Sequence, residues 1–600
     1  MTPQRCKAFR WVLLLALLAV SVACLPGRIA PAERNPEELY YQDVAWLSAP
    51  ERQGRGLATE GIQQAARYIE ASFRDMGLQP VFSDGYGQTF TALVGATVGS
   101  DSFVSLAGKA LSPSQYRLFG ISSRGSFSAP VVFAGYGISA PELGYDDYAG
   151  EDVEGKVVLI LRYEPKGRAG FDSGELTEHA TFRSKIFTAR RKGAAAVLLV
   201  NGPRDAPDDQ DALVSMQNDP MAGAGFGIPM FQIARHSIVP LLAEKGLSLE
   251  AWQQGVDAGR NPRARSLGFT AEGRADISRE VHPVENVGGL LPGKDPSRTL
   301  IVGGHYDHLG FGGPYAATGS TERIFHGADD NASGTAGVLA LARRYAAGKQ
   351  PPVSILFLAF SAEESGLVGS TYFVQHRGQK HGRLVAMINL DMIGRLRQGR
   401  LTVFGTGSAA AFPGLVSAAT GEVIRLTKKP AGFGPSDHAP FYAAGVPVLH
   451  FWTGSHADYH LPSDTVDKIH VAGAMEVLGM VERVMDGIMA GPGLTYQGTK
   501  DASVVPGGVA RGTGAGWLGI APNFAADIVG VKVASVLPGS PAENVLMPGD
   551  ILLSVDGKTI LNYYELAYWL RRHTAGDEVT LRILRNQRVQ SLVLRLDDQP

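Results

Sequence analysis

Residues 299–308 read TLIVGGHYDH, an uninterrupted apolar run that ends in two histidines and an aspartate. Three runs of the same kind follow along the chain, VSILFLAF at 353–360, LVAMINL at 384–390 and VPVLHFW at 446–452. Near-continuous apolar runs of strand length are typical of a sheet that is covered on both faces. The sequence therefore predicts an α/β fold, with a mostly parallel sheet flanked by helices in residues 266–493.

The segments between and around these strands have apolar residues at the spacing typical of amphipathic helices. The stretches SGTAGVLALARRYAAG, at residues 333–348, and VAGAMEVLGMVERVMDGIM, at residues 471–489, repeat their apolar side chains at helical spacing. Upstream, GLATEGIQQAARYIEASFRDMG at residues 56–77 has the same periodicity, with Thr59 as the expected N-cap. We expect this amphipathic helix to pack on the α/β core, which assigns residues 24–120 to the N-terminal part of the same domain.

Other regions differ from this α/β pattern. Residues 121–265 contain short apolar runs between glycine turns, such as GKVVLILRY, and predict a β-rich domain inserted into the host fold. Residues 494–515 are rich in glycine and lack periodicity, so they predict a linker. Residues 516–600 combine short strands with an amphipathic helix from Tyr563 to Arg572 and predict a compact α+β unit.

Length and charge set broad limits on the class of protein. At 600 residues the chain exceeds what one hydrophobic core supports, and 74 glycines and 35 prolines indicate many turns. The net charge is −2 and no basic stripe with interleaved aromatic side chains occurs, so the composition offers no electrostatic surface for nucleic acid. We expect a protein of several domains that does not bind nucleic acid.

The N-terminus has the pattern of an export signal. Residues 1–23 contain a basic start, the apolar run WVLLLALLAV and the small residues SVA, which predicts a cleaved signal peptide and a periplasmic or extracellular location. The two cysteines are Cys6, inside the signal, and Cys24, directly after it, so no internal disulfide is expected. Cys24 resembles the lipidated residue of bacterial lipoproteins, although Ser21 stands where that motif usually has Leu. Lipid anchoring at Cys24 and plain release both stay open, and any membrane contact would be through that anchor.

Side chains that can bind metal follow the predicted strands. In open α/β sheets, ligands bind at the carboxyl ends of the strands. Histidines and carboxylates gathered at one such edge, without thiolates, favour a divalent metal held by nitrogen and oxygen, most naturally zinc. The candidate ligands are His305, Asp330, Glu364, Asp391 and His460.

The stretch FHGADDNASGTAG, at residues 325–337, places Asp329 and Asp330 side by side with no Lys or Arg nearby in the sequence. Such a pair is either a solvated turn that caps a helix or part of a site that supplies its own positive charge. The ligand count favours the site, because one catalytic zinc needs three protein ligands and five are present. Two zinc ions that share one carboxylate use all five, since ions in two-metal sites lie about 3.5–4 Å apart.

In this order and at these spacings, GGHYDHLG, GADDNASGTAG, FSAEESGLVGS, INLDMIG and DYHLPSDT resemble the co-catalytic zinc aminopeptidases. That family contains secreted bacterial leucine-type aminopeptidases and has glutamate carboxypeptidase and the transferrin receptor as relatives. The resemblance covers roughly residues 50–120 and 265–490. It implies a zinc-exopeptidase fold and an aminopeptidase that acts on peptides, with SDHAPF at residues 436–441 lining the pocket.

The resemblance also divides the five ligands between two zinc ions. It implies that His305, Asp330 and Asp391 hold one ion. Asp330, Glu364 and His460 would hold the other, so that Asp330 bridges the two.

Three neighbouring carboxylates receive supporting roles. Side chains adjacent in an extended segment point to different sides, so Glu363 and Glu364 should not both bind the same ion. The resemblance makes Glu363 the general base, which takes a proton from the attacking water and passes it to the leaving amine. It makes Asp307 the carboxylate that orients the imidazole of His305. Asp329 is expected to support the backbone of its loop.

Two further resemblances concern the added domains. Residues 121–265, including YDDYAGEDVEGKVVLILR, resemble the protease-associated domain that is inserted in several exopeptidases. Residues 516–600 resemble a PDZ domain, with WLGI at residues 517–520 as the expected carboxylate-binding loop. Because PDZ domains bind an extended peptide by strand addition, we expect a C-terminal peptide ligand here.

Two alternative functions stay open at this stage. A carboxypeptidase on the same fold would need an Arg or Lys for the free carboxylate, and Arg395 lies just after Asp391. A non-catalytic protein would bind peptides through the PDZ-like and inserted domains, although the intact ligands and Glu363 argue against it. The remaining histidines with no matching ligand motif are expected at the surface or around the ligands, and they are His308, His326, His438, His450 and His456.

Overall fold

The computed structural model describes residues 35–598 with internal gaps. The gaps are residues 141–142, 167, 169–170, 172–176, 207–210, 214–224, 261–262, 313–322, 378–380, 433, 499–515, 524–529, 537–539, 561–562 and 571. The predicted signal peptide, Cys24 and most of the predicted linker lie outside the described residues. Among the described helices, none combines the length and the apolar character needed to cross a membrane.

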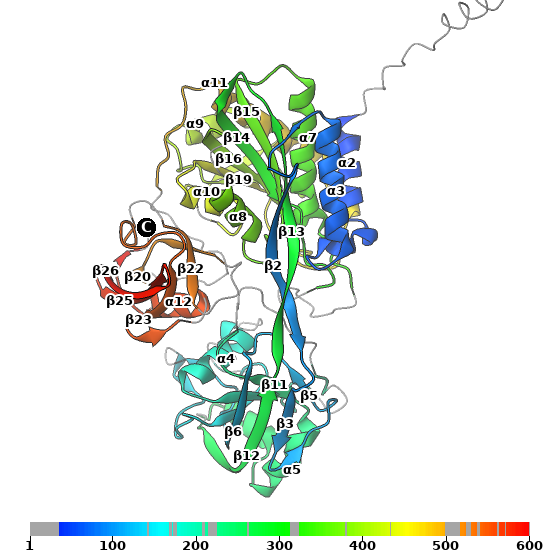
Figure 1. Cartoon of the computed structure of the whole chain (residues 1–600). Helices are drawn as coiled ribbons and strands as arrows, with labels where there is room; N and C mark the ends of the chain where they lie inside the picture. Colours follow the sequence, from blue (N-terminus) through cyan, green and yellow to red (C-terminus); the bar gives the residue numbers. More distant parts are fainter. Residues whose placement is uncertain are drawn as a thin grey trace, which may run out of the picture.

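The largest sheet carries the strands predicted from the apolar runs. Its strands are β1 (Gln79–Pro80), β2 (Gly87–Val98), β13 (Ile277–Leu291), β14 (Asp295–His305), β15 (Val353–Phe360), β16 (Arg383–Leu390), β17 (Arg400–Phe404), β18 (Arg425–Lys428) and β19 (Val448–Trp452). Their order is β1-β13-β15-β14-β16-β19-β17-β18, with β2 beside β13 (Figure 1). The four middle strands β15, β14, β16 and β19 are parallel, and β13 and β17 join them antiparallel. The predicted parallel core is confirmed, and the flanking strands make the whole sheet mixed.

Helices cover both faces of this sheet, as its apolar strands require. Their bounds are α2 (Pro36–Leu47), α3 (Glu60–Asp75), α7 (Gly334–Ala347), α8 (Val368–His376), α9 (Phe412–Ala418), α10 (His438–Ala443) and α11 (Val471–Ala490). Successive residues of β14 point to opposite faces. Leu300 and Val302 pack with α2, α3, α7, α9 and α11, whereas Ile301 packs with α8 and α10 (Figure 1).

The predicted N-terminal helix is α3, and its apolar face is buried. Ile62, Ile69 and Phe73 lie in the core shared with the sheet. Thr59 precedes the helix, as predicted for the N-cap, but its hydroxyl donates to the carbonyl of Gly56 at 2.7 Å and accepts nothing from the helix. The position of the helix therefore follows from its apolar face rather than from a side-chain cap.

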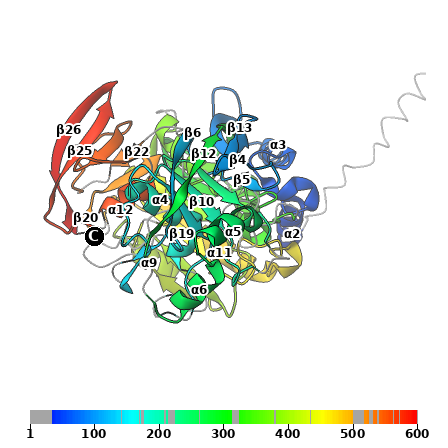
Figure 2. The same ribbon diagram turned by 90° about the horizontal axis from the view of Figure 1, so that it is seen from below.

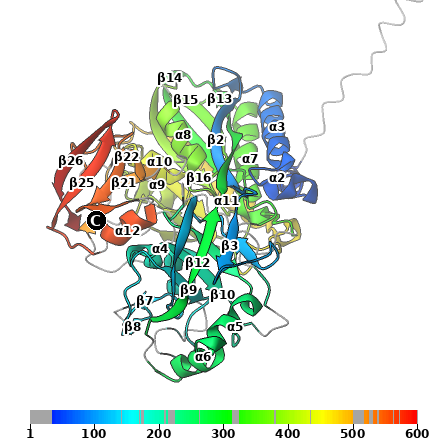
Figure 3. The ribbon, with the colours of Figure 1, turned by 60° about the horizontal axis from the view of Figure 1, so that its bottom comes forward.

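A long two-stranded ribbon leads from this sheet to a second one. β2 and β13 pair antiparallel along nearly their whole length, and β13 also pairs with β15 (Figure 1). The second sheet contains β3 (Phe103–Leu106), β4 (Lys109–Ala110), β5 (Tyr116–Leu118), β6 (Gly125–Phe133), β9 (Val157–Leu161), β10 (Ala196–Val200), β11 (Met230–Ile233) and β12 (Arg265–Ala275). Its helices are α4 (Phe182–Arg191), α5 (Arg235–Glu244) and α6 (Leu249–Asp257), and Figure 3 shows them around this sheet.

The strands of this second sheet run from Phe103 to Ala275, a wider range than the 121–265 expected for the inserted domain. β3, β4 and β5 are only two to four residues long and lack the continuous apolar run that marks a buried strand. β3 enters the sheet by pairing with β12, β4 by pairing with β3, and β5 by pairing with β11 at the other edge.

The C-terminal region forms a third unit with a core of its own. Its sheet has the order β21-β22-β23-β25-β26, and its helix covers a core that includes Val533, Leu552 and Leu581. The elements are β20 (Gly516–Trp517), β21 (Ile520–Asn523), β22 (Val531–Val536), β23 (Ile551–Val555), β24 (Lys558–Thr559), α12 (Tyr563–Leu570), β25 (Glu578–Arg585), β26 (Arg588–Arg595) and β27 (Asp597–Asp598). Figure 2 shows this unit at one side of the molecule. The helix α12 contains most of the predicted helix at Tyr563–Arg572.

Candidate metal centre

The predicted ligands come from the carboxyl ends of neighbouring parallel strands. His305 is the last residue of β14, and Asp391 directly follows β16. Glu364 comes four residues after the end of β15, and His460 lies in the loop after β19. Asp330 lies in the segment that leads into α7. All five therefore meet at the edge of the sheet where ligands of open α/β folds bind.

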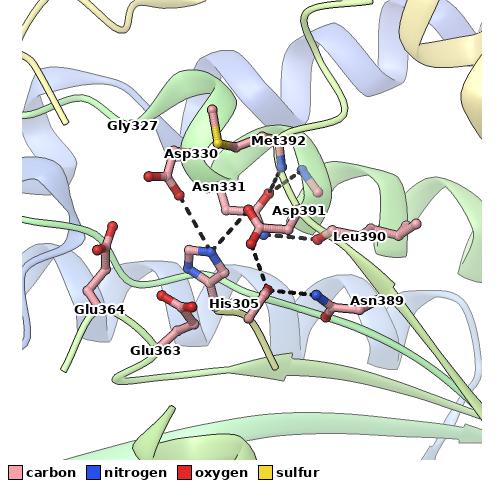
Figure 4. Close-up of polar contacts among 12 residues, drawn as sticks. His305, Gly327, Asp330, Asn331, Glu363, Glu364, Asn389, Leu390, Asp391 and Met392 are labelled. Carbon is pink, nitrogen blue, oxygen red and sulfur yellow. Dashed lines mark hydrogen bonds and ion pairs between the residues drawn. The ribbon is translucent and has the colours of Figure 1, made fainter. Parts of the chain in front are cut away.

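The two carboxylate oxygens of Asp330 face two different groups of donors. Its Oδ1 lies 3.5 Å from His305 Nε2, which is also 3.4 Å from Asp391 Oδ1 (Figure 4). Its Oδ2 lies 3.1 Å from His460 Nε2, which is also 3.2 Å from Glu364 Oε2. Ligand atoms of one tetrahedral zinc are about 3.3 Å apart, because zinc–nitrogen and zinc–oxygen bonds are about 2.0–2.2 Å long. Both groups have this spacing.

One buried oxygen in the first group lacks a hydrogen bond. Asp391 Oδ2 accepts from the hydroxyl of Ser436 at 2.7 Å, and Ser436 in turn accepts from Asn389 at 2.7 Å. Asp391 Oδ1 is buried and has no hydrogen-bond partner among the described residues. A buried acceptor left free on the side that faces His305 fits a metal ligand, because an unpaired polar atom is otherwise costly. The donor set of this structure thus fits a divalent ion.

Backbone strain gathers in the loops that carry the ligands. Ala362, Met392 and His460 all adopt left-handed φ values, of 58°, 51° and 55°. Ala362 lies two residues before Glu364, and Met392 directly follows Asp391. Residues without a glycine's freedom take up this conformation at a cost of about 1–3 kcal/mol each, which is typical of functional sites.

The loop of Asp330 is held by its neighbours. Asp464 Oδ2 accepts from the backbone amides of Asp329 and Asp330 at 2.9 and 3.1 Å. The carboxylate of Asp329 accepts from the amide of Gly394 at 2.7 Å and from the Ser333 hydroxyl at 3.0 Å. Asp329 therefore has backbone contacts, whereas Asp330 presents both oxygens to the candidate ligands.

Two arginines lie close to the Asp329–Asp330 loop, although neither is near it in the sequence. Arg55 is fully buried and donates to the carbonyls of His326 and Gly327 at 2.9 and 2.8 Å. Arg395 Nη2 donates to Asp464 at 3.1 Å. Both guanidinium groups thus lie near the paired aspartates in three dimensions, although neither hydrogen-bonds to Asp330 among the described residues. Arg55 comes from a segment about 270 residues away, which local sequence could not reveal.

Asp307 contacts the segment of the two glutamates and also lies near the His305 ring. Its carboxylate accepts from the amides of Glu363 and Glu364 at 3.1 and 3.3 Å, and it lies 3.9 Å from His305 Nδ1. The Nδ1 of His305 is instead 3.3 Å from the backbone carbonyl of Asp307. Burial raises the pKa of Asp307 to about 6, against the lowering effect of His305. The carboxylate thus orients the segment that carries both glutamates.

The charges of the site favour bound cations. Burial alone would lower the pKa of His460, but Glu364 and Asp330 raise it to about 11. Burial raises the pKa of Glu363 well above its usual value, and Glu364 adds to this against the opposing effect of His305. Figure 4 shows the carboxylates of Glu363 and Glu364 near the His305 ring. The excess of carboxylates must be balanced by protons or by metal ions.

The histidines without a ligand motif occupy several positions. His308 is buried and lies 2.6 Å from Glu364 Oε1 through its Nδ1. His438 and His450 are buried and stacked, and Asn389 lies 3.1 Å from His450. His456 lies 3.2 Å from Asp329, and the half-buried His326 is 3.0 Å from the carbonyl of Ser48. The SDHAPF stretch was the only sequence signal for part of this network, through Ser436 and His438.

Fold and donor arrangement together define an α/β protein with a candidate two-ion metal centre. Residues 286–485 match the profile of peptidase family M28, residues 127–239 that of the PA domain and residues 514–596 that of the PDZ domain. The chain therefore contains a region of peptidase family M28 together with a PA domain and a PDZ domain. All three family resemblances expected from the sequence motifs are confirmed.

Individual relatives have names that agree with this family. Aminopeptidase YwaD of Bacillus subtilis (strain 168) is 28% identical over 356 residues, which are 56% of this chain and 63% of that protein. A probable leucine aminopeptidase of Arthroderma otae is 28% identical over 200 residues, 32% of this chain and 54% of that protein. The solved structure of BSAP, a zinc aminopeptidase from Bacillus subtilis, covers 75% of this chain and 94% of its own, with 22% identity and a TM-score of 0.49. The chain spans less than two thirds of the length of these two curated relatives.

Proposed function

We propose that the chain is an exported metallo-aminopeptidase that uses two zinc ions to remove N-terminal residues from peptides. The observation that carries the proposal is the geometry of Asp330, whose two oxygens face His305 and His460 separately. The match of residues 286–485 to peptidase family M28 supports a peptidase, and the names of the aminopeptidase relatives support the N-terminal specificity.

Five side chains would hold the two ions. His305 and Asp391 would hold one, Glu364 and His460 the other, and Asp330 would bridge them. Nitrogen and oxygen donors at these spacings suit zinc. When bound, zinc supplies Lewis-acid activation of the scissile carbonyl and of water.

Glu363 is the proposed general base of the reaction. It is adjacent to Glu364, and burial raises the pKa of its carboxyl, which brings a carboxylate closer to the range suited to proton transfer. In this role it takes a proton from the attacking water and delivers it to the leaving amine. Asp307 supports the role of Glu363 by accepting from its backbone amide, which fixes the turn after β15.

Action at the N-terminus is favoured over action at the C-terminus by the state of the nearby arginines. A carboxypeptidase needs a cation free to pair with the substrate carboxylate. Arg395 donates to Asp458 and Asp464 at 3.2 and 3.1 Å and is only 12% exposed. Arg55 is fully buried and donates only to backbone carbonyls. The surplus of carboxylates suits the free α-amine of a peptide.

We further propose roles for the ends of the chain. The signal-like pattern of residues 1–23 supports export, with lipid anchoring at Cys24 as one form of it. The PDZ domain would bind the C-terminal tail of a peptide or protein beside β21 through the loop at residues 517–520. The bounds of the inserted domain are proposed from its strands, Phe103 to Ala275.

The test is hydrolysis of a matched peptide panel. One peptide has both ends free, a second is N-acetylated and a third is amidated at its C-terminus. We expect cleavage of the first and third only, loss of cleavage with a chelator and its return with zinc. Cleavage that requires a free C-terminus would establish the carboxypeptidase alternative. A zinc-loaded chain that binds these peptides but cleaves none would establish the non-catalytic one.

A further inference from the structure

His308 is the histidine whose environment the proposed reaction does not explain. Its side chain is fully buried next to the second donor group, and its Nδ1 lies 2.6 Å from Glu364 Oε1. The other ring nitrogen, Nε2, is buried and has no hydrogen-bond partner among the described residues. The sequence motifs assigned no role to this residue.

The short distance to Glu364 identifies a hydrogen bond. Pairs of ligand atoms around one zinc lie about 3.3 Å apart. His460 has this spacing, with Nε2 at 3.2 Å from Glu364 Oε2 and 3.1 Å from Asp330 Oδ2. His308 does not, because its Nδ1 is 2.6 Å from Glu364 Oε1 but 3.8 Å from Asp330 Oδ2. His308 thus donates to one oxygen of Glu364, and the other oxygen faces His460.

The fold clamps the His308 ring in this position. Gly327 has φ of 57°, and a Cβ on it would lie 2.5 Å from Cδ2 of His308, so the ring occupies the space that a side chain would need. The backbone amide of His308 donates to the carbonyl of Arg55 at 3.2 Å. Arg55 in turn donates to the carbonyl of Gly327 at 2.8 Å. The ring is therefore held from both the β14 loop and the Asp330 loop.

We infer that His308 is a positioning residue for the second zinc ion. By donating its Nδ1–H to Glu364 Oε1, it turns Oε2 toward His460 and Asp330. The inference rests on the proposed two-zinc function and adds to it a residue that acts through Glu364. Partners that hydrogen-bond to ligating carboxylates typically contribute about 10–100-fold to metal affinity.

Two substitutions of His308 separate positioning from packing. His308→Asn places an amide N–H where Nδ1–H was and keeps the hydrogen bond to Glu364, whereas His308→Leu fills similar space without a donor. His376→Leu, on the exposed surface of α8, is the matched control. Zinc content and stepwise affinity are measured by competition with a chromogenic chelator on the full chain.

We expect two ions in the wild type, in His376→Leu and in His308→Asn. In His308→Leu the second ion should bind about 10–100-fold more weakly. X-ray absorption of the zinc-loaded chain should give the same number of imidazole ligands per zinc in the wild type and in His308→Asn. The unfolding temperatures of the two His308 variants, measured with chelator present, should be similar. A difference in zinc affinity between the variants can then be assigned to the metal site rather than to folding.

Three results would overturn the inference. Equal affinity for both ions in His308→Leu and the wild type would show that His308 has no part in the site. Equal weakening in both variants, or a lost imidazole in His308→Asn, would show a packing or ligand role instead. A wild-type chain that holds fewer than two zinc ions would remove the proposed function itself and this inference with it.

Discussion

Arg55 offers the most direct test of how the ligand loops are held. Its guanidinium is completely buried and donates four hydrogen bonds, all to backbone carbonyls. The acceptors and distances are Tyr306 at 2.7 Å, Leu47 at 2.8 Å, His326 at 2.9 Å and Gly327 at 2.8 Å. Tyr306 follows the proposed ligand His305, and Gly327 precedes Asp330 by three residues, so Arg55 ties the loops of both residues to α2.

The expected cost of removing this group follows from those contacts. Burial lowers the pKa of Arg55 to about 10 against the raising effects of Asp330 and Asp307, so the group is charged at neutral pH. Arg55→Met would leave three of the four carbonyls without a donor, because that of Gly327 also accepts from the amide of Ala332 at 3.2 Å. At about 1 kcal/mol each, the loss is about 3 kcal/mol of unfolding free energy. Arg55→Lys keeps a charge and three donors but loses the planar geometry, and should cost about 1–2 kcal/mol.

The assay is urea unfolding with chelator present, combined with hydrogen exchange of the two loops. The control is Arg74→Met, because Arg74 is exposed on α3, where it pairs with Glu70 and lies 5.6 Å over the ring of Tyr86. Such exposed contacts are worth about 0.5–1 kcal/mol each. Faster exchange in residues 299–308 and 325–337 should accompany the loss in Arg55→Met. A loss below about 1 kcal/mol, or unchanged exchange in both loops, would refute the structural role of Arg55.

The remaining predictions concern the metal, acid stability and the inserted domain. Asp330→Ala should abolish binding of both zinc ions, which metal analysis would measure. Asp329→Ala should keep both ions but lower the unfolding temperature, because it removes the hydrogen bond to the amide of Gly394. Burial lowers the pKa of His450 from 6.5, its ordinary value, to about 4 in the folded chain. Above pH 6.5 the neutral ring costs no stability. As the pH falls from 6.5 toward 4, the free energy of unfolding should fall by about 1.4 kcal/mol per pH unit. His450→Asn keeps an acceptor for Asn389 and should remove this pH dependence of the unfolding free energy between pH 6.5 and 4. An unchanged pH dependence would contradict the lowered pKa of His450. Lys185 is buried in the inserted domain and donates to the carbonyls of Tyr136 and Tyr163. Lys185→Met should therefore cost about 2 kcal/mol in urea unfolding by leaving both carbonyls without this donor, and a cost under about 0.5 kcal/mol would contradict this.

The parallel core and the order of the ligands could be read from the sequence because both are local. The apolar runs at residues 299–304 and 353–360 mark buried strands, and the polar residues after them must lie at the carboxyl edge. In the structure, His305, Asp330 and Asp391 do lie at this edge, and their side-chain donor atoms are within a few ångströms of one another.

What escaped the sequence depends on contacts between distant segments. Arg55 reaches Tyr306 across 251 positions, and nothing in its own stretch marks it as buried. His308 follows the strand end like a solvent-facing residue, and only the fold brings it to Glu364 across 56 positions. The short strand β3 gives no apolar run of its own, because its place in the second sheet comes from pairing with β12 far along the chain.

The central claim is that a two-zinc centre with Glu363 as base cleaves N-terminal residues. Zinc content and turnover of Glu363→Gln on an amino-acyl substrate, measured on the same preparation, test it most directly. Glu363 is not among the proposed ligands, so the variant should keep two zinc ions and lose about 10²–10⁴-fold in kcat, the usual contribution of a general base. A Glu363→Gln chain that holds both ions and turns over at the wild-type rate would contradict the account.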